Sequence, residues 1–207
     1  WPFYCVLVTL LAREAVIGTE TLAARDAREN NEVHNTQYDI VRFYNTTDPT
    51  WTFLSSDGGT PTCEVDVLEN ITETNLTFFK YFYQGTRKYG QRYSGYFDKW
   101  APYVDATVYN QVVLGYAGLE PFKNEELWFA PEDFSCGVLK VNMAKNLGNW
   151  FDLRVRNSSL GSISTSECRR RFVLHAKPPI RTVYNEDCQK ILQPGDYLEG
   201  NGILNAK

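Results

Sequence analysis

The chain has 207 residues, a length that suits one domain with short tails. Hydrophobic residues make up 43% of it and charged residues 22%, the balance of a globular protein with a packed core. The formal net charge of −4 argues against a nucleic-acid partner, which requires a basic surface. Aromatic residues reach 14%, a share that favours strands and cavities lined by rings.

The beginning of the chain resembles a secretory signal peptide. Residues 1–12 are almost wholly apolar, but they are too few to span a bilayer, which needs about 20 residues. A small residue that suits signal-peptidase cleavage follows at Gly18. We therefore predict a truncated signal peptide over residues 1–18, with a buried N-terminal strand as the alternative, and a lead-in segment over residues 19–35. No other apolar run approaches membrane length, so we expect no membrane contact.

From residue 36 onward the sequence favours β-strands. Period-two alternation and aromatic density predict strands at residues 38–43, 63–69, 76–84, 104–114, 126–129, 136–143 and 150–156. Many short strands separated by turn residues predict an antiparallel meander, and closing it into a barrel removes its exposed edges. We therefore predict an all-β barrel domain over residues 36–192 and a C-terminal tail over residues 193–207.

One helix is expected after the last of these strands. Ser164 and Glu167 have the spacing of a capping box, in which the two side chains bond to otherwise unpaired backbone amides. The helix should end near Ala176, because two prolines follow. Cys168, Phe172 and Ala176 then share one face at i, i+4 spacing, which should lie against the barrel wall.

The cysteines and the glycosylation sequons both indicate export. Cys5 lies within the predicted signal peptide, which leaves Cys63, Cys136, Cys168 and Cys188. Four cysteines in a secreted chain imply two disulfides, with three possible connectivities. Four N-x-S/T sequons accompany them, at Asn45, Asn70, Asn75 and Asn157. We therefore predict a secreted, extracellular glycoprotein. The cysteine spacing and the scarcity of histidine argue against a metal site.

Three blocks of sequence together resemble the salivary lipocalins of ticks, the histamine-binding family. They are Asp48-Pro49-Thr50-Trp51 with Cys63; Cys136-Gly137-Val138 with Asp152-Leu153-Arg154 and Cys168; and Asn185-Glu186-Asp187-Cys188. The resemblance implies a lipocalin-type antiparallel barrel with a C-terminal α-helix and the disulfides Cys63–Cys188 and Cys136–Cys168. It also implies a secreted protein that sequesters a small host mediator, such as histamine, in its cavity to suppress host defence.

The amine-binding signature of that family is altered in this chain. Gly137 stands where the family has Asp, Asp152 replaces Glu, and Arg154 replaces an aromatic residue. An ammonium ligand needs a carboxylate and ring faces. Asp152 can still supply a carboxylate, whereas an inward Arg154 would repel a cation and favour an anionic or neutral ligand. We therefore expect weak or no histamine binding.

The remaining candidate ligand-binding residues are carboxylates and rings. The resemblance places Asp48 and Trp51 near the barrel mouth, although an Asp-Pro turn with a packed Trp is an equal alternative. Glu126 and Trp128 share one strand face. Possible cavity-lining rings, each also explicable by core packing, are Tyr44, Phe82 and Tyr109. The acidic pair Glu125-Glu126 is expected in a solvated turn or strand end. No catalytic arrangement is present, so we expect neither enzymatic activity nor a cofactor.

Three functions follow from these observations. The first is a monomeric scavenger of biogenic amines such as histamine or serotonin. The second is a scavenger of lipid-like mediators or sterols, with Arg154 binding a carboxylate. The third is a module that binds a host immune or haemostatic protein through its outer loops. The direction of Arg154 distinguishes the first two, and a barrel filled by its own side chains would leave the third.

Overall fold

The computed structural model describes residues 38–99 and 108–199. The chain divides into two units, residues 1–36 and 37–207, and every described residue belongs to the second unit. The predicted signal peptide, the lead-in segment, the first part of the strand expected at residues 104–114 and the end of the tail lie outside the described residues.

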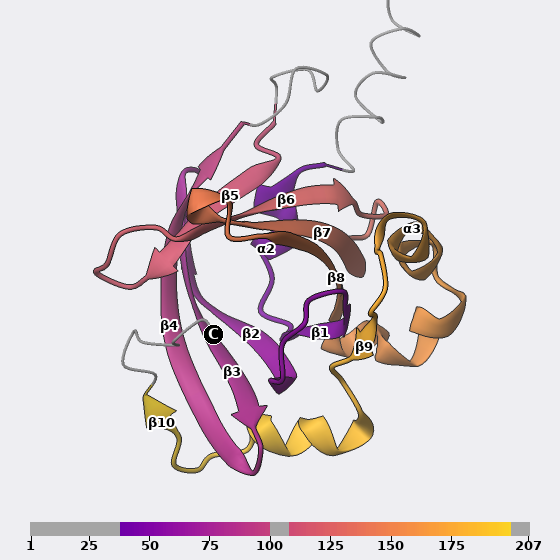
Figure 1. The fold of residues 1–207 in the computed structure, drawn as a ribbon. Helices are drawn as coiled ribbons and strands as arrows, with labels where there is room; N and C mark the ends of the chain where they lie inside the picture. Colours follow the sequence, from indigo (N-terminus) through magenta and orange to yellow (C-terminus); the bar gives the residue numbers. More distant parts are fainter. Residues whose placement is uncertain (1–37, 100–107, 200–207) are drawn as a thin grey trace, which may run out of the picture. The chain divides into compact units, whose positions relative to one another are not determined.

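Eight antiparallel strands of the described chain close into a barrel (Figure 1). They are β1 (Thr50–Ser55), β2 (Thr62–Ile71), β3 (Asn75–Gln84), β4 (Arg87–Asp98), β5 (Gln111–Tyr116), β6 (Lys123–Phe129), β7 (Cys136–Met143) and β8 (Asn149–Arg156). Consecutive strands pair with each other, and β8 returns beside β1, which closes the ring. The predicted antiparallel barrel is therefore confirmed. Two short strands extend the same sheet: β9 (Arg181–Thr182) pairs with β1, and β10 (Leu198–Glu199) pairs with β4.

The alternating strand directions give the barrel two distinct ends. The β2–β3, β4–β5 and β6–β7 connections lie at one end, which we call the α2 end. Helix α2 (Ile40–Tyr44) belongs to it, because the Ile40 amide donates to the Tyr109 carbonyl at 3.0 Å and the chain then enters β1. The β1–β2, β3–β4, β5–β6 and β7–β8 connections lie at the opposite end.

The strand predicted at residues 38–43 is wrong, because this segment forms α2. The Asp39 side chain caps the helix by accepting a hydrogen bond from the Arg42 amide, at 3.0 Å. Ile40, Phe43 and Tyr44 are buried, which is the i, i+3, i+4 spacing of one helix face. In so short a segment this pattern resembles strand alternation.

Two strands were not predicted, and one begins later than expected. Strand β1 follows an Asp-Pro turn, and β4 contains glycines and many polar residues, which obscure the alternation. Strand β5 begins at Gln111, after Tyr109 and Asn110. The remaining predicted strands correspond to β2, β3, β6, β7 and β8.

Helix α3 (Glu167–His175) follows the 3-10 helix η2 (Asn157–Thr165) and packs on the outside of β7 and β8. Its cap is Ser166, which accepts from the Arg169 amide at 3.2 Å, so the predicted start at Ser164 is two residues early. The expected inner face is confirmed, since Cys168 and Phe172 are fully buried. Burial of a Phe side chain stabilises a fold by about 1.5–3 kcal/mol.

Both disulfides form with the pairing that the family resemblance implies. Cys136 of β7 is bonded to Cys168 of α3, with the Cα atoms 6.2 Å apart. Cys63 of β2 is bonded to Cys188 of the 3-10 helix η3 (Glu186–Leu192), with the Cα atoms 5.0 Å apart. Each bond therefore fastens an outer helix to a barrel strand. A further 3-10 helix, η1 (Ala144–Asn146), lies in the β7–β8 connection.

Strand alternation sorts the hydrophobic residues into an inner and an outer set. The inner cluster includes Phe43, Leu76, Phe78, Tyr93, Phe97, Val112, Leu114, Leu127 and Leu139. Outer clusters lie beneath α3, around Val138, Leu153 and Phe172, and beneath η3, around Trp51, Val65 and Ile191. Because successive side chains of a strand point to opposite faces, one strand serves both sets.

Glycine at position 137, where the tick lipocalin signature has Asp, has a steric explanation in α2. A Cβ atom added to Gly137 would lie 2.5 Å from the ring of Phe43, which is itself 2% exposed. We predict that Gly137→Asp lowers the free energy of unfolding by about 1–3 kcal/mol, because an overfilled core must shift. Denaturant unfolding measures the change. Gly58→Asp is the control, since a Cβ at Gly58 meets nothing within 4 Å, and equal effects of the two substitutions would contradict the prediction.

Candidate functional site

The middle of the barrel is occupied by the side chain of Arg154 from β8. It is 1% exposed and points inward, so the direction that the sequence left open is settled. Its two terminal nitrogens donate to the carboxylate of Glu125, on β6, at 2.8 and 2.9 Å. One of them also donates to Asp66, on β2, at 3.1 Å, and to the hydroxyl of Tyr44, on α2, at 2.9 Å. Three elements besides β8 thus converge on one guanidinium.

Two lysines complete this cluster. Lys80 lies 2.7 Å from Asp66, and Lys123 lies 2.7 Å from Glu125. Burial alone would raise the pKa of Glu125, but Arg154 and Lys123 hold the pKa of this carboxyl well below its usual value. Burial would likewise lower the pKa of Lys80, yet Asp66 keeps it above its usual value. Glu125 and Lys80 therefore stay charged, each beside a partner of opposite sign.

Asp152 is an inward carboxylate in the first half of β8, the half that begins at the end opposite α2. It lies on β8 one inward position from Arg154 and pairs across the sheet with Ser55, the last residue of β1. Its Oδ1 accepts from Ser55 at 2.7 Å and from the Trp150 indole at 3.0 Å, and its Oδ2 accepts from Arg154 at 3.3 Å. Burial raises the pKa of Asp152, and Arg154 offsets only part of this increase. Its negative charge is therefore less fully compensated than that of Glu125.

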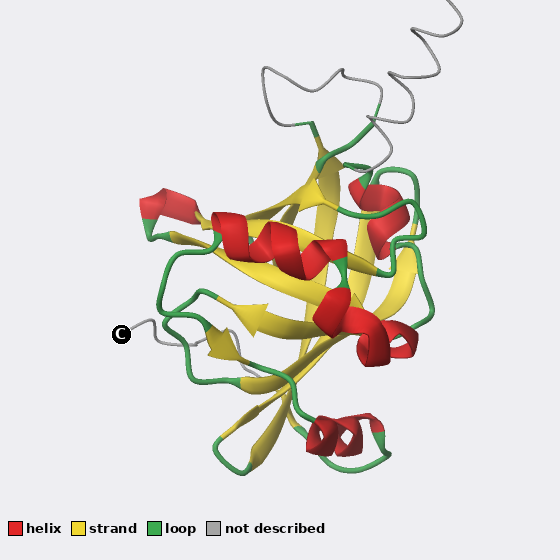
Figure 2. Cartoon of the chain, turned by 90° about the vertical axis from the view of Figure 1, so that its right-hand side faces the viewer, coloured by secondary structure: helices red, strands yellow, loops and turns green. Residues whose placement is uncertain are grey.

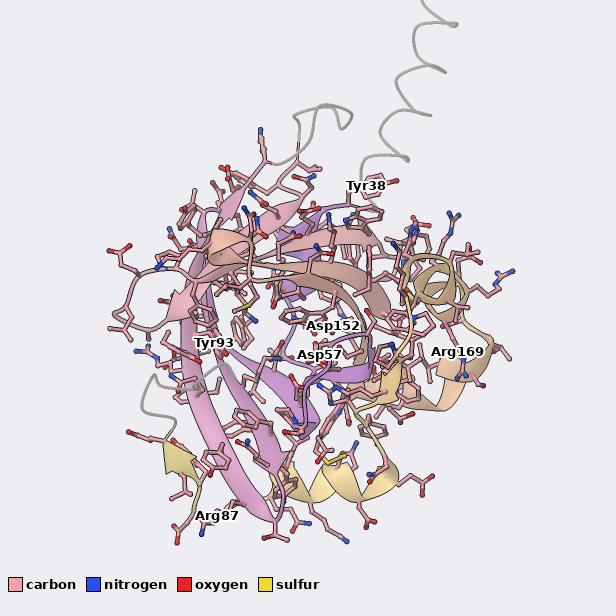
Figure 3. All side chains as sticks on the ribbon, viewed as in Figure 1. Tyr38, Asp57, Arg87, Tyr93, Asp152 and Arg169 are labelled. Carbon is pink, nitrogen blue, oxygen red and sulfur yellow. A yellow bond between two sulfur atoms is a disulfide. The ribbon has the colours of Figure 1, made fainter. Side chains whose placement is uncertain are left out.

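Aromatic rings from β4 and its neighbours lie on the inner side of the barrel. Tyr93 is buried, and its ring lies 5.2 Å from Tyr116 and 6.1 Å from Phe122 between ring centroids. The Lys123 ammonium lies 4.9 Å from the centroid of the Tyr93 ring, a cation–π distance. Figure 3 shows Tyr93 and Asp152 on the inner side of the ring of strands, from different strands. Phe82 of β3 stacks on Tyr89 with centroids 5.5 Å apart.

The structure separates Asp48 from Trp51. Asp48 accepts hydrogen bonds from the backbone and hydroxyl groups of Ser158, at 3.0 and 2.6 Å. The space that it borders with Tyr44 measures about 10 Å³, roughly enough for one water molecule. Trp51 points outward into the cluster beneath η3, and its indole donates to Asn157 at 3.0 Å. The two residues therefore do not form one site.

Glu126 and Trp128 lie on the face of β6 opposite to Glu125. The carboxylate of Glu126 accepts hydrogen bonds from the Trp128 indole at 3.1 Å and from the Asn142 side chain at 2.6 Å. Lys140 lies 5.4 Å from the Trp128 ring. This carboxylate and ring thus occupy the outside of the barrel. Tyr109, the last of the predicted rings, packs against the inner cluster beside Phe97.

Sequence reasoning missed most of the central cluster. Glu125 was expected in a solvated turn or strand end, which is wrong, because it is fully buried within β6. Lys123, Glu125 and Leu127 alternate along that strand, so their shared face was visible in the sequence. The cluster's other members, Asp66 and Lys80, come from distant strands, and no local pattern pairs them with Arg154.

The four sequons differ in their surroundings. Asn45, Asn70 and Asn75 are exposed, whereas Asn157 is half-buried and accepts hydrogen bonds from both Trp51 and Gln189. We predict that glycans occupy the three exposed sites and not Asn157 when the protein is secreted from eukaryotic cells. Glycopeptide mass spectrometry measures site occupancy, and full occupancy at Asn157 would contradict the prediction.

The described residues also exclude two kinds of feature. No helix among them is long and apolar enough to cross a bilayer. Nor do they contain a group of three His, Cys, Asp or Glu side chains arranged to bind a metal ion.

Comparison with known proteins identifies solved structures that have a similar fold. No family model matches the chain, and no curated protein matches it in sequence. The crystal structure of AM182 in complex with serotonin is similar, with a TM-score of 0.54 and 18% sequence identity over 72% of this chain and 91% of that one. Japanin from Rhipicephalus appendiculatus, bound to cholesterol, gives a TM-score of 0.46 and 15% identity over 69% and 96% of the two chains. The chain thus has a lipocalin-like fold.

Arg154 should be essential for stability, because it compensates buried acids. We predict that Arg154→Met lowers the free energy of unfolding by about 3–5 kcal/mol at neutral pH. Glu125, whose pKa is depressed in the fold, contributes stability above its unfolded pKa and loses it as the pH falls through the folded pKa. Since Arg154 causes much of this depression, the deficit of the variant should shrink as acid protonates the carboxyls.

Denaturant unfolding at neutral and at acidic pH measures this deficit. Arg156→Met is the control, because Arg156 is half-buried on the same strand and outside the cluster. A deficit that is equal at both pH values would contradict the assigned role of Arg154.

Proposed function

We propose that the chain is a secreted protein that sequesters a small aromatic amine inside its barrel, near the end opposite α2. The observation that carries the proposal is the inward carboxylate of Asp152, which the Trp150 indole contacts at 3.0 Å, in a barrel whose inner side also carries the ring of Tyr93. Ring faces and a carboxylate are the two partners that an aromatic ammonium ligand needs. The fold that the chain shares with AM182, a protein crystallised with serotonin, supports the same ligand class.

The charges of the barrel interior are paired within the protein. Arg154, Lys80 and Lys123 lie beside Glu125, Asp66 and Asp152. Glu64 is paired with Arg181 at 3.0 Å. Arg154 points inward, as an anion-binding residue would, but three carboxylates of the protein already surround it. Its repulsion of a cation is therefore largely cancelled.

The same contacts disfavour a lipid carboxylate at Arg154. Both terminal nitrogens of the guanidinium already donate to protein oxygens, so an anionic ligand would have to displace Glu125 or Asp66 from it. Histamine also fits poorly, because it offers a smaller ring to the aromatic wall and the family signature is altered at Gly137 and Arg154. We therefore expect an indole amine to bind more tightly than histamine.

Isothermal titration of the purified protein with serotonin tests the proposal. We expect binding near micromolar Kd, about −8 kcal/mol, and about tenfold or greater weakening in Asp152→Asn. Glu126→Gln is the matched control, because that carboxylate lies on the outer face of the same barrel, and its affinity should be unchanged. Cholesterol uptake without serotonin binding, or equal affinity in both variants, would overturn the assignment.

A further inference from the structure

The solvent-facing side of α3 carries a concentration of positive charge. Residues 166–180 contain three arginines and one lysine against the single acid Glu167, a formal charge of +3. Since the whole chain carries −4, the remainder carries −7. Glu167 contacts both Arg170 and Arg171, whose side chains remain 73% and 49% exposed. The helix is therefore a basic region on an otherwise acidic molecule.

Large apolar side chains accompany these cations. Leu174 is 76% exposed and Val173 is 59% exposed, both on the side of α3 that faces away from Cys168 and Phe172. At the helix C-terminus His175 packs edge-on against Trp128 of β6, which is itself 37% exposed. Exposed apolar groups that gather in one place indicate an interaction site.

The region is held rigidly. The Cys136–Cys168 disulfide joins α3 to β7, and Phe172 is fully buried in the cluster beneath the helix. Figure 2, which views the molecule from this side, shows the helix lying across the outer surface of the strands. A surface that is already ordered loses little conformational entropy when it binds a partner.

We propose that the outer face of α3, formed by Arg169, Arg170, Val173, Leu174 and Lys177, docks an acidic segment of a partner protein that also presents apolar side chains. Arginine is enriched at the centres of protein interfaces, and a guanidinium binds a carboxylate through two parallel hydrogen bonds. This surface lies outside the barrel and does not depend on the ligand within it.

Two other anionic partners fit the surface less well. A sulfated polysaccharide would use the cations but leave the exposed leucine and valine without contacts. A membrane-bound helix inserts its apolar face, whereas the most apolar face of α3 is already buried against β7 and β8. The mixture of charge and exposed aliphatic groups favours a protein segment.

Fluorescence anisotropy with a labelled synthetic peptide tests the proposal. The probe is an acidic peptide of about 15 residues in which Glu and Asp alternate with Leu and Trp, and polyglutamate of the same length is the comparison. We expect the mixed peptide to bind more tightly than polyglutamate, and Arg170→Glu/Leu174→Glu to weaken its binding by about tenfold or more. Serotonin binding should be the same in this variant as in the unmodified protein, which separates the two proposals.

Arg87→Glu supplies a matched charge reversal, because Arg87 is exposed at the start of β4 and far from α3 in Figure 3. It should leave peptide binding unchanged. Equal affinity for polyglutamate, binding of only heparin or phosphatidylserine vesicles, or no loss in the double variant would overturn the proposal. Circular dichroism verifies that the variants fold, since both altered positions of the double variant are exposed.

Discussion

The positive charge of Arg154 is buried in the low-dielectric interior of the barrel, so carboxylates must lie beside it. This requirement determines how the interior of the barrel is arranged. Moving an isolated ion into a protein interior costs several kcal/mol even after relaxation, so the group is retained only with close partners of opposite sign. Here Glu125 supplies two hydrogen bonds, and Asp66 and Asp152 complete the compensation. Strands β2, β6 and β8 are thereby held in one relative arrangement.

The compensation also bears on where the proposed ligand could bind. The centre of the barrel is filled by Arg154, Glu125 and Tyr44, each less than 8% exposed. The amine proposed above would therefore contact Asp152 rather than this filled centre. Arg154, which stands where the tick lipocalin signature has an aromatic residue, is itself part of this filled centre.

Local patterns in the sequence predicted part of this arrangement. The inner face of α3 followed from the spacing of Cys168 and Phe172, and β7 matched its predicted bounds. The disulfide pairing came from family resemblance, since spacing alone allowed three connectivities. The Arg154 cluster could not be predicted from the sequence, because its members approach one another only when β2, β3, β6 and β8 close into a ring. Helix α2 was missed for a related reason: five residues are too few to separate helical from strand periodicity.

Strand alternation has a consequence for how such a protein can diversify. Along β8, Asp152 and Arg154 face the lumen, while Leu153 and Val155 support the helix outside. Each side chain of the strand contacts only one face of the sheet. Substitutions on the outer face therefore need not change the inner face, and substitutions on the inner face need not change the outer face. The same strands can therefore carry two surfaces that evolve independently, a concave one inside the barrel and a convex one outside it.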